Sequence, residues 1–204
     1  MPRKPDKPLE DVFLNIPYDN KFENLCLAYV SGVSAFGLNP RATLEIPGSM
    51  RRLDRIFHLI QSCAYSVHDL SRVELDRTRP RTPRFNMPFE LGMCVAWAAT
   101  GGGKHEWFVF ESMDRRLAKS LSDLNGTDPN IHRETVAGVF RELCNAFVRS
   151  RRKPTIQQMW RVYRDVRKSL PRTLRRAGAK SIYNARVFKD ICVVASASAD
   201  VRVI

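Results

Sequence analysis

The sequence predicts an α/β fold in which a parallel sheet carries helices on both faces and is followed by a basic helical extension. Short apolar runs alternate with segments of helical spacing between residues 10 and 148. Polar residues follow several of these runs, at the strand ends where an open parallel sheet binds its ligands. After residue 148 Lys and Arg dominate the chain. We therefore expect a flexible N-terminal segment (residues 1–9), an α/β domain (10–148) and a mainly helical extension (149–204).

Strands and helices alternate along the predicted domain. Apolar runs predict strands over residues 11–17, 41–46, 64–69 and 106–111. Apolar residues spaced three or four apart predict helices over residues 22–36, 49–62, 88–100, 132–148 and 155–170. Ser49 and Thr155 are suitable N-caps, and Pro88 suits a first helical turn because its missing N–H has no partner there. Residues 115–125 are expected to be partly helical, and the last fifteen residues either form a strand or fray.

Composition indicates a cytoplasmic protein with reduced thiols. The chain has 204 residues, of which 44% are hydrophobic, and no apolar run approaches the roughly 18 residues of a membrane span. The first eight residues are charged and rich in proline, without the apolar core of a secretory signal. Five widely spaced cysteines, an odd number, fit buried thiols better than disulfides or a zinc site. We expect no metal, no cofactor and no membrane contact.

The positive charge is concentrated in one segment. The chain carries a net charge of +13, and residues 149–189 contain 14 Lys and Arg but a single acidic residue, Asp165. Such a segment is typical of a surface that binds nucleic acid or another polyanion, or an acidic protein partner. A solvated helical face is the alternative, because basic composition alone does not separate the two.

Two acidic residues flank the region that is expected to bind a ligand. Asp69 and Ser71 end the strand over residues 64–69, and Glu90 is expected in the first turn of the next helix. Tyr18 and Asp19 follow the first strand, so all of these residues are predicted to face one crevice. A glutamate in a first helical turn can also act only as a cap or interact with the helix dipole.

Arginines crowd the loop between residues 72 and 84. This connection is long for an α/β unit, which indicates a lid or binding loop. Arg81 and Arg84 are candidates for contacts with a phosphate group, because guanidinium binds phosphate in a bidentate manner.

The segments 13–19 (FLNIPYD), 69–71 (DLS) and 86–92 (NMPFELG) resemble the Toll/interleukin-receptor-like and nucleoside 2-deoxyribosyltransferase-like superfamily. The resemblance covers roughly residues 10–148, and the turn at 122–126 is similar to one in bacterial members. It implies a flavodoxin-like fold, a homo-oligomer, and cleavage of N-glycosidic bonds in nucleotides, nucleosides or nicotinamide dinucleotide, with Glu90 at the position of the essential glutamate. The deoxyribosyltransferase branch usually has another acid where this chain has Arg84.

The chemistry expected of these residues follows from the bond that would break. Cleavage of a ribose–base bond develops positive charge on the sugar, which the Glu90 carboxylate can stabilise or trap. Nicotinamide leaves without needing a proton, whereas other bases need an acid, for which Asp69 or His68 are candidates. Tyr18 and Asp19 are candidates for binding ribose hydroxyls.

Asn86 is a candidate for orienting Glu90 or for binding the sugar, and His68 is equally interpreted as a hydrogen-bonded packing residue. We therefore expect an N-glycosidase acting on a nicotinamide dinucleotide or related nucleotide, and the resemblance suggests a role in bacterial defence or as a toxin. The alternatives are a non-catalytic module that senses nucleotides and assembles, and a nucleoside 2-deoxyribosyltransferase, which Arg84 disfavours.

Overall fold

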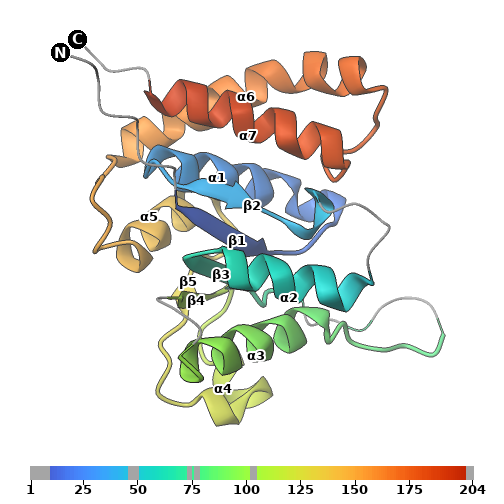
Figure 1. The fold of residues 1–204 in the computed structure, drawn as a ribbon, viewed down its shortest axis with the longest axis vertical. Helices are drawn as coiled ribbons and strands as arrows, with labels where there is room; N and C mark the ends of the chain where they lie inside the picture. The colour runs from blue at the N-terminus through green and yellow to red at the C-terminus, as the bar shows by residue number, and fades with distance from the viewer. Residues whose placement is uncertain (1–9, 46–50, 73–74, 76–78, 102–104, 201–204) are drawn as a thin grey trace.

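The chain forms a five-stranded, all-parallel sheet with strand order β2-β1-β3-β4-β5. The computed structural model describes residues 10–45, 51–72, 75, 79–101 and 105–200. The strands are β1 (Asp11–Asn15), β2 (Asn39–Arg41), β3 (Tyr65–Asp69), β4 (Glu106–Glu111) and β5 (Asn130–Ile131). Helices cover both faces of the sheet, as Figure 1 shows. The predicted α/β class and the flavodoxin-like arrangement are confirmed.

The two faces of the sheet have separate cores. On one face, α1 (Glu23–Ala35) and α5 (Val136–Ala146) pack on side chains such as Leu14 and Val67. On the other face, α2 (Arg52–Ser62) and α3 (Asn86–Ala99) surround Phe13. The short α4 (Arg116–Ser120) adds Leu117 to a second cluster on this face, with Leu91 of α3 and Val109 of β4. Alternate residues of one strand therefore serve different cores, as the period of two in a strand requires.

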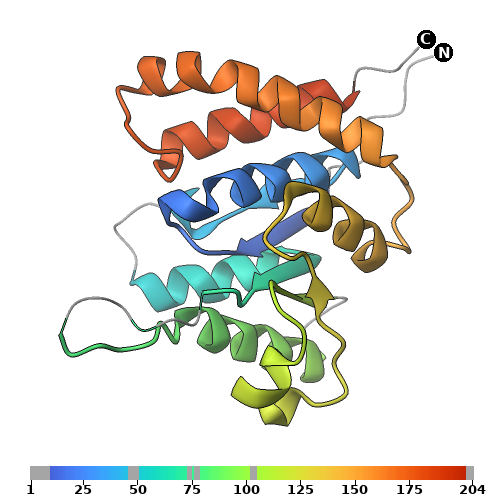
Figure 2. The same ribbon diagram turned by 180° about the vertical axis from the view of Figure 1, so that it is seen from behind.

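A third layer of helices lies on the outer side of α1. It consists of α6 (Ile156–Ala177) and α7 (Ala185–Asp200), which are seen beyond α1 in Figures 1 and 2. Thr155 begins α6 with a reciprocal capping box to Gln158, and Gly178 ends it in the left-handed conformation. The buried residues of both helices belong to the same hydrophobic cluster as those of α1. The basic extension is thus packed on the α/β domain through a shared core.

The predicted strand over residues 41–46 is wrong. The strand is Asn39–Arg41, and the chain then turns through a 3-10 segment, Thr43–Glu45. The Glu45 carboxylate accepts the backbone N–H of Ala42 at 2.8 Å and pairs with Arg41 at 3.2 Å. These local bonds to a side chain close a turn that the apolar composition of the segment did not indicate.

Other boundaries also differ from expectation. β5 was not predicted, because two residues are too short for a strand pattern. α5 begins at Val136 rather than at residue 132, since Thr135 accepts the N–H of Gly138 as an N-cap. α6 continues past exposed Pro171 to Ala177, and most of the last fifteen residues form the end of α7.

Ser49, residues 1–9 and residues 201–204 lie outside the described residues. None of the helices in the described ranges combines the length and apolar character that a membrane span requires.

The shared core predicts that the C-terminal helices contribute directly to the stability of the domain. Phe188 in α7 is 1% exposed, so Phe188→Ala should lower the free energy of unfolding by about 3–4 kcal/mol. Val193 in the same helix is 61% exposed, and Val193→Ala should change it by less than about 0.5 kcal/mol. Denaturant unfolding of the full chain tests this. Equal midpoints for the two variants would contradict a shared core.

Candidate functional site

The strand order places a candidate ligand crevice between β1 and β3. The helix after β1, α1, lies on one face of the sheet, and the helix that follows β3, α3, lies on the other. In open α/β sheets such a switch point leaves a crevice at the carboxyl ends of the two strands. Tyr18 and Asp19 follow β1, Ser71 and Arg72 follow β3, and Glu90 is carried by α3.

Glu90 lies in the second turn of α3, so the prediction of a first-turn position is wrong. The helix begins at Asn86, two residues before Pro88, and its first turn contains no acidic residue. Pro88 remains within the first turn, as expected. Because Glu90 is the fifth helical residue and is 5% exposed, it does not act as a cap. A carboxyl group buried in this way requires another explanation.

The environment of Glu90 disfavours the ionised form of its carboxyl group. Burial raises the pKa of Glu90 to about 7, and the positive charge of Arg52 at the start of α2 only partly opposes this. Within the described residues, its carboxylate has no hydrogen-bond partner. The Glu90 charge also helps to raise the pKa of Tyr18, mainly raised by burial, so these two side chains lie within electrostatic reach. Glu90, Arg52 and Tyr18 thus form one group at the carboxyl edge of the sheet.

The loop after β1 is in contact with the segment between α6 and α7. The Tyr18 hydroxyl lies 3.2 Å from Thr43 Oγ1, and its ring centroid lies 5.4 Å from that of Tyr183, between α6 and α7. The Tyr183 hydroxyl donates to the carbonyl oxygen of Asp19 at 2.8 Å. Tyr183 was not predicted, because nothing in the local sequence links it to a loop 164 residues away.

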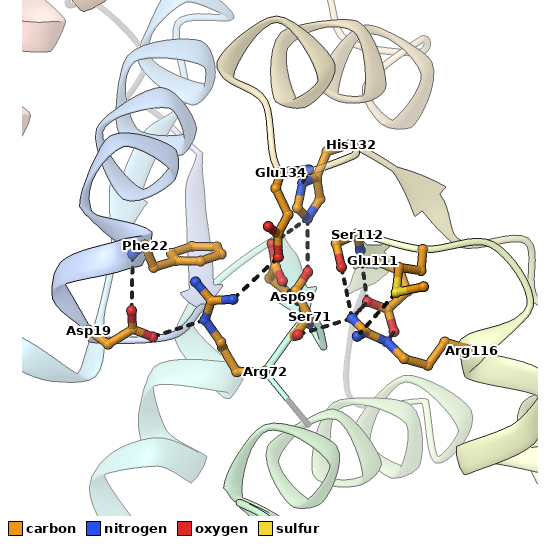
Figure 3. A network of polar contacts seen from close by, with 11 residues as sticks. Asp19, Phe22, Asp69, Ser71, Arg72, Glu111, Ser112, Arg116, His132 and Glu134 are labelled. Atoms are coloured by element: carbon orange, nitrogen blue, oxygen red, sulfur yellow. Dashed lines mark hydrogen bonds and ion pairs between the residues drawn. The ribbon is translucent and has the colours of Figure 1, made fainter. Parts of the chain in front are cut away.

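Asp69 is completely buried on the other side of the sheet, where it accepts hydrogen bonds from three groups, and Figure 3 shows its contact with His132. The hydroxyl of Tyr29 donates to it at 2.7 Å and the N–H of Ser71 at 2.9 Å, while His132 Nε2 lies 3.1 Å away. Burial alone would raise the pKa of Asp69, but the hydrogen bonds from His132, Ser71 and Tyr29 outweigh it and lower the pKa. Asp69 is therefore an ionised carboxylate that joins α1, β3 and the segment before α5.

Ser71, His132 and Asp69 have the residue types of a hydrolase triad but a different geometry. A triad requires the serine and the aspartate on opposite nitrogens of the imidazole. Here Ser71 Oγ lies 3.0 Å from His132 Nε2, the nitrogen that also faces Asp69. The other nitrogen, Nδ1, accepts the backbone N–H of Glu134 at 3.0 Å. Since Ser71 is also 1% exposed, this cluster fixes the fold of the loops and offers no nucleophile.

Arg72 links the loops on this side of the crevice. Its guanidinium lies 3.2 Å from the Asp19 carboxylate, 3.3 Å from that of Glu134 and over the ring of Phe22 (Figure 3). The loops after β1, β3 and β5 are thereby held together. Next to it, Arg116 donates to the Ser71 carbonyl oxygen at 3.0 Å and pairs with buried Glu111, which adds the loop after β4 to the same network.

The contacts do not bring Asp69 and Glu90 together. The partners of Asp69 come from α1 and the segment before α5, on one face of the sheet. Glu90 belongs to α3 on the opposite face and interacts electrostatically with Arg52 and Tyr18. The two carboxyl groups that the sequence places near each other therefore occupy separate environments.

His68 belongs to a chain of hydrogen bonds inside the sheet. Its Nδ1 accepts from the amide of Asn15 at 2.9 Å, and its Nε2 lies 2.9 Å from Ser66 Oγ. Ser66 in turn lies 2.9 Å from Nε2 of His105, whose Nδ1 donates to the carbonyl of Cys63 at 2.8 Å. Burial lowers the pKa of His68 to about 3. These contacts support the packing role of His68 over a role as an acid.

The remaining predicted residues lie on the surface. Arg81, Arg84 and Asn86 are exposed, and within the described ranges they make no hydrogen bond or ion pair. They are available to a ligand but are not fixed in position by the protein. Among the described residues, no cluster of three or more His, Cys, Asp or Glu side chains could hold a metal ion.

No protein-family model, no curated protein and no solved structure matches this chain. The resemblance to the Toll/interleukin-receptor-like superfamily and the homo-oligomer that it implies remain predictions.

A double-mutant cycle tests the structural role of Asp69. His132→Ala should lower the free energy of unfolding by about 3 kcal/mol, because it takes one of three donors from a buried carboxylate and leaves only Tyr29 and the Ser71 N–H. In an Asp69→Asn background the same change should be smaller by about 1–2 kcal/mol, since no buried charge is then left unpaired. Denaturant unfolding of the four proteins measures this coupling. Strictly additive effects would show that the contact contributes nothing to the stability of the loops.

Proposed function

We propose that the protein is an N-glycosidase that cleaves the ribose–base bond of a nicotinamide dinucleotide or a related nucleotide, with Glu90 as the key carboxylate. The observation that carries this proposal is the buried Glu90 carboxyl group, which has no hydrogen-bond partner in the described residues and lies at the β1/β3 switch point. A carboxyl group in this state destabilises the fold and is typical of a functional site.

The reaction requires a negative charge close to C1′ of the ribose. When the C1′–N bond breaks, its electron pair goes to the base and C1′ becomes positively charged. A nicotinamide ring is cationic before cleavage and leaves as a neutral molecule, so this step needs no proton donor. Water then bonds to C1′ and releases a proton. Ionised Glu90 stabilises the positive charge, and the cationic substrate favours that ionised form.

The surroundings of Glu90 provide groups for the rest of a nucleotide. Tyr18 and Asn86 are proposed to contact the ribose, and Arg52, Arg81 and Arg84 to contact phosphate oxygens. Asp69 and Ser71 are proposed to position the loops, because their polar atoms are already bonded within the protein. Asp19 shares that role, since its carboxylate caps the turn at Phe22 and pairs with Arg72.

The cleavage reaction can be tested by measuring base release. Purified protein is incubated with a panel of nicotinamide dinucleotides, nucleotides and nucleosides, and free base is measured by chromatography. Wild type should release base from at least one compound, and Glu90→Gln should reduce the rate by at least about a hundredfold, because charge stabilisation is often the largest catalytic term. Glu106→Gln, an exposed change at the amino end of β4, is the matched control and should retain full activity.

Two outcomes would replace this proposal. If no compound releases base, and Glu90→Gln only weakens nucleotide binding, the protein is a nucleotide-sensing module without catalysis. If base is transferred between deoxynucleosides instead of released, it is a deoxyribosyltransferase despite Arg84.

The raised pKa of Glu90 also predicts a dependence of stability on pH. The folded state binds the proton of the Glu90 carboxyl group more tightly than the unfolded state does. The stabilisation of the folded state by this proton is therefore fully present below the ordinary pKa of 4.5 and is lost as pH rises through about 7. Glu90→Gln removes the effect, so the variant should gain roughly 3 kcal/mol over wild type between pH 4 and pH 8. Denaturant unfolding at these two pH values measures the gain. A constant difference would mean that Glu90 is solvated.

A further inference from the structure

Helix α6 has two faces of opposite character. One face is buried against α1 and its neighbours, through the side chains of Met159, Val162, Tyr163, Val166, Leu170 and Thr173. The other face carries cations spaced three or four residues apart, which places them in one row along the helix. We call this row the basic stripe, and its members are Arg161, Arg164, Lys168, Arg172 and Arg175.

Four members of the basic stripe carry charges that no described acidic residue pairs with. Arg164, Lys168, Arg172 and Arg175 are exposed, and none of these four forms an ion pair with a described residue. The one acidic residue of α6, Asp165, forms no ion pair with these four cations, and its carboxylate accepts a hydrogen bond from the Ser198 hydroxyl of α7. Arg167, which lies off the stripe, is bonded to Asn24 of α1. The exposed cations of the stripe therefore lie together on the face of α6 that is opposite its buried residues.

We propose that the basic stripe binds the phosphate backbone of a nucleic acid. The row extends over about 21 Å at about 1.5 Å per residue, and one strand of a duplex presents about six phosphates over that length of its axis. Four of the five residues are Arg, whose planar guanidinium pairs with phosphate in a bidentate manner. Contacts between these cations and phosphate oxygens carry no sequence information, so the proposed binding is to the backbone and independent of sequence.

The structure favours a nucleic acid over a membrane or an acidic protein. A helix that lies in a membrane interface inserts its apolar face, but the apolar face of α6 is already buried in the protein core. An acidic protein surface rarely presents a regular row of charges, whereas a phosphate backbone always does. This inference is independent of the proposed glycosidase activity, since no residue of the stripe contacts the Glu90 group.

The test compares two variants of equal net charge. In the stripe variant, Arg164→Gln, Lys168→Gln and Arg172→Gln are combined. In the control variant, Lys119→Gln, Arg133→Gln and Arg141→Gln remove three exposed cations from the α/β domain. Binding of a labelled 20-base-pair DNA duplex of mixed sequence is followed by fluorescence anisotropy between 50 and 200 mM salt, and circular dichroism melts establish that each variant is folded.

Wild type and the control variant should bind the duplex with a steep salt dependence. The stripe variant should bind at least about tenfold more weakly, and its slope of log affinity against log salt should be smaller by roughly 2–3, because each lost phosphate contact removes about 0.9. Equal weakening of both triple variants would overturn the proposal, since the charge would then act diffusely. Failure of wild type to bind the duplex at 50 mM salt would also overturn it, as would stripe-dependent binding only to vesicles of anionic lipid or to a polyglutamate chain.

Discussion

The arrangement of the carboxyl edge depends on one buried carboxylate. Asp69 ends β3 with no exposure to solvent, and a charge in that position is tolerated only because Tyr29, the Ser71 N–H and His132 donate to it. These donors belong to α1, to the end of β3 and to the segment before α5. Satisfying one charge therefore fixes three separate parts of the chain, and Arg72 extends the connection to the loop after β1. These bonds hold together the loops at the carboxyl ends of β1 and β3.

Glu90 differs from Asp69 in what surrounds it, although both are buried acids at the same edge of the sheet. The donors around Asp69 lower its pKa, whereas burial without donors raises that of Glu90 to about 7. Environments that drive the pKa values of two carboxyl groups apart commonly give them different roles. The fold explains Asp69, whereas for Glu90 we propose that a bound ligand supplies the missing partners. This contrast is the physical basis of the proposed function.

The sequence predicts well what depends on local patterns. The runs that form β1, β3 and β4, the helical spacing of α1, and the N-cap of α6 at Thr155 are local, and the parallel α/β class follows from the alternation of strands and helices. The turn at Thr43–Glu45 was missed because a side chain, Glu45, competes with the strand for a backbone N–H. The sequence singles out Glu90 as a candidate site residue, but its position in the second turn of the helix was not predicted, because α3 begins before Pro88. The separation of Asp69 from Glu90 and the contact of Tyr183 with the β1 loop arise from packing between distant segments, which no local pattern encodes.

The C-terminal helices connect the two proposals while leaving them independent. Their apolar faces complete the core on α1, Tyr183 holds the loop next to Glu90, and the opposite face of α6 remains basic. The central claim is that Glu90 is a buried carboxyl group kept without partners for a ligand. Carbon-13 NMR titration of the side-chain carboxyl groups, assigned with Glu90→Gln, tests it most directly. The account predicts that the Glu90 carboxyl titrates near pH 7, while Asp69 titrates below its ordinary range. A Glu90 pKa close to the ordinary 4.5 would contradict it.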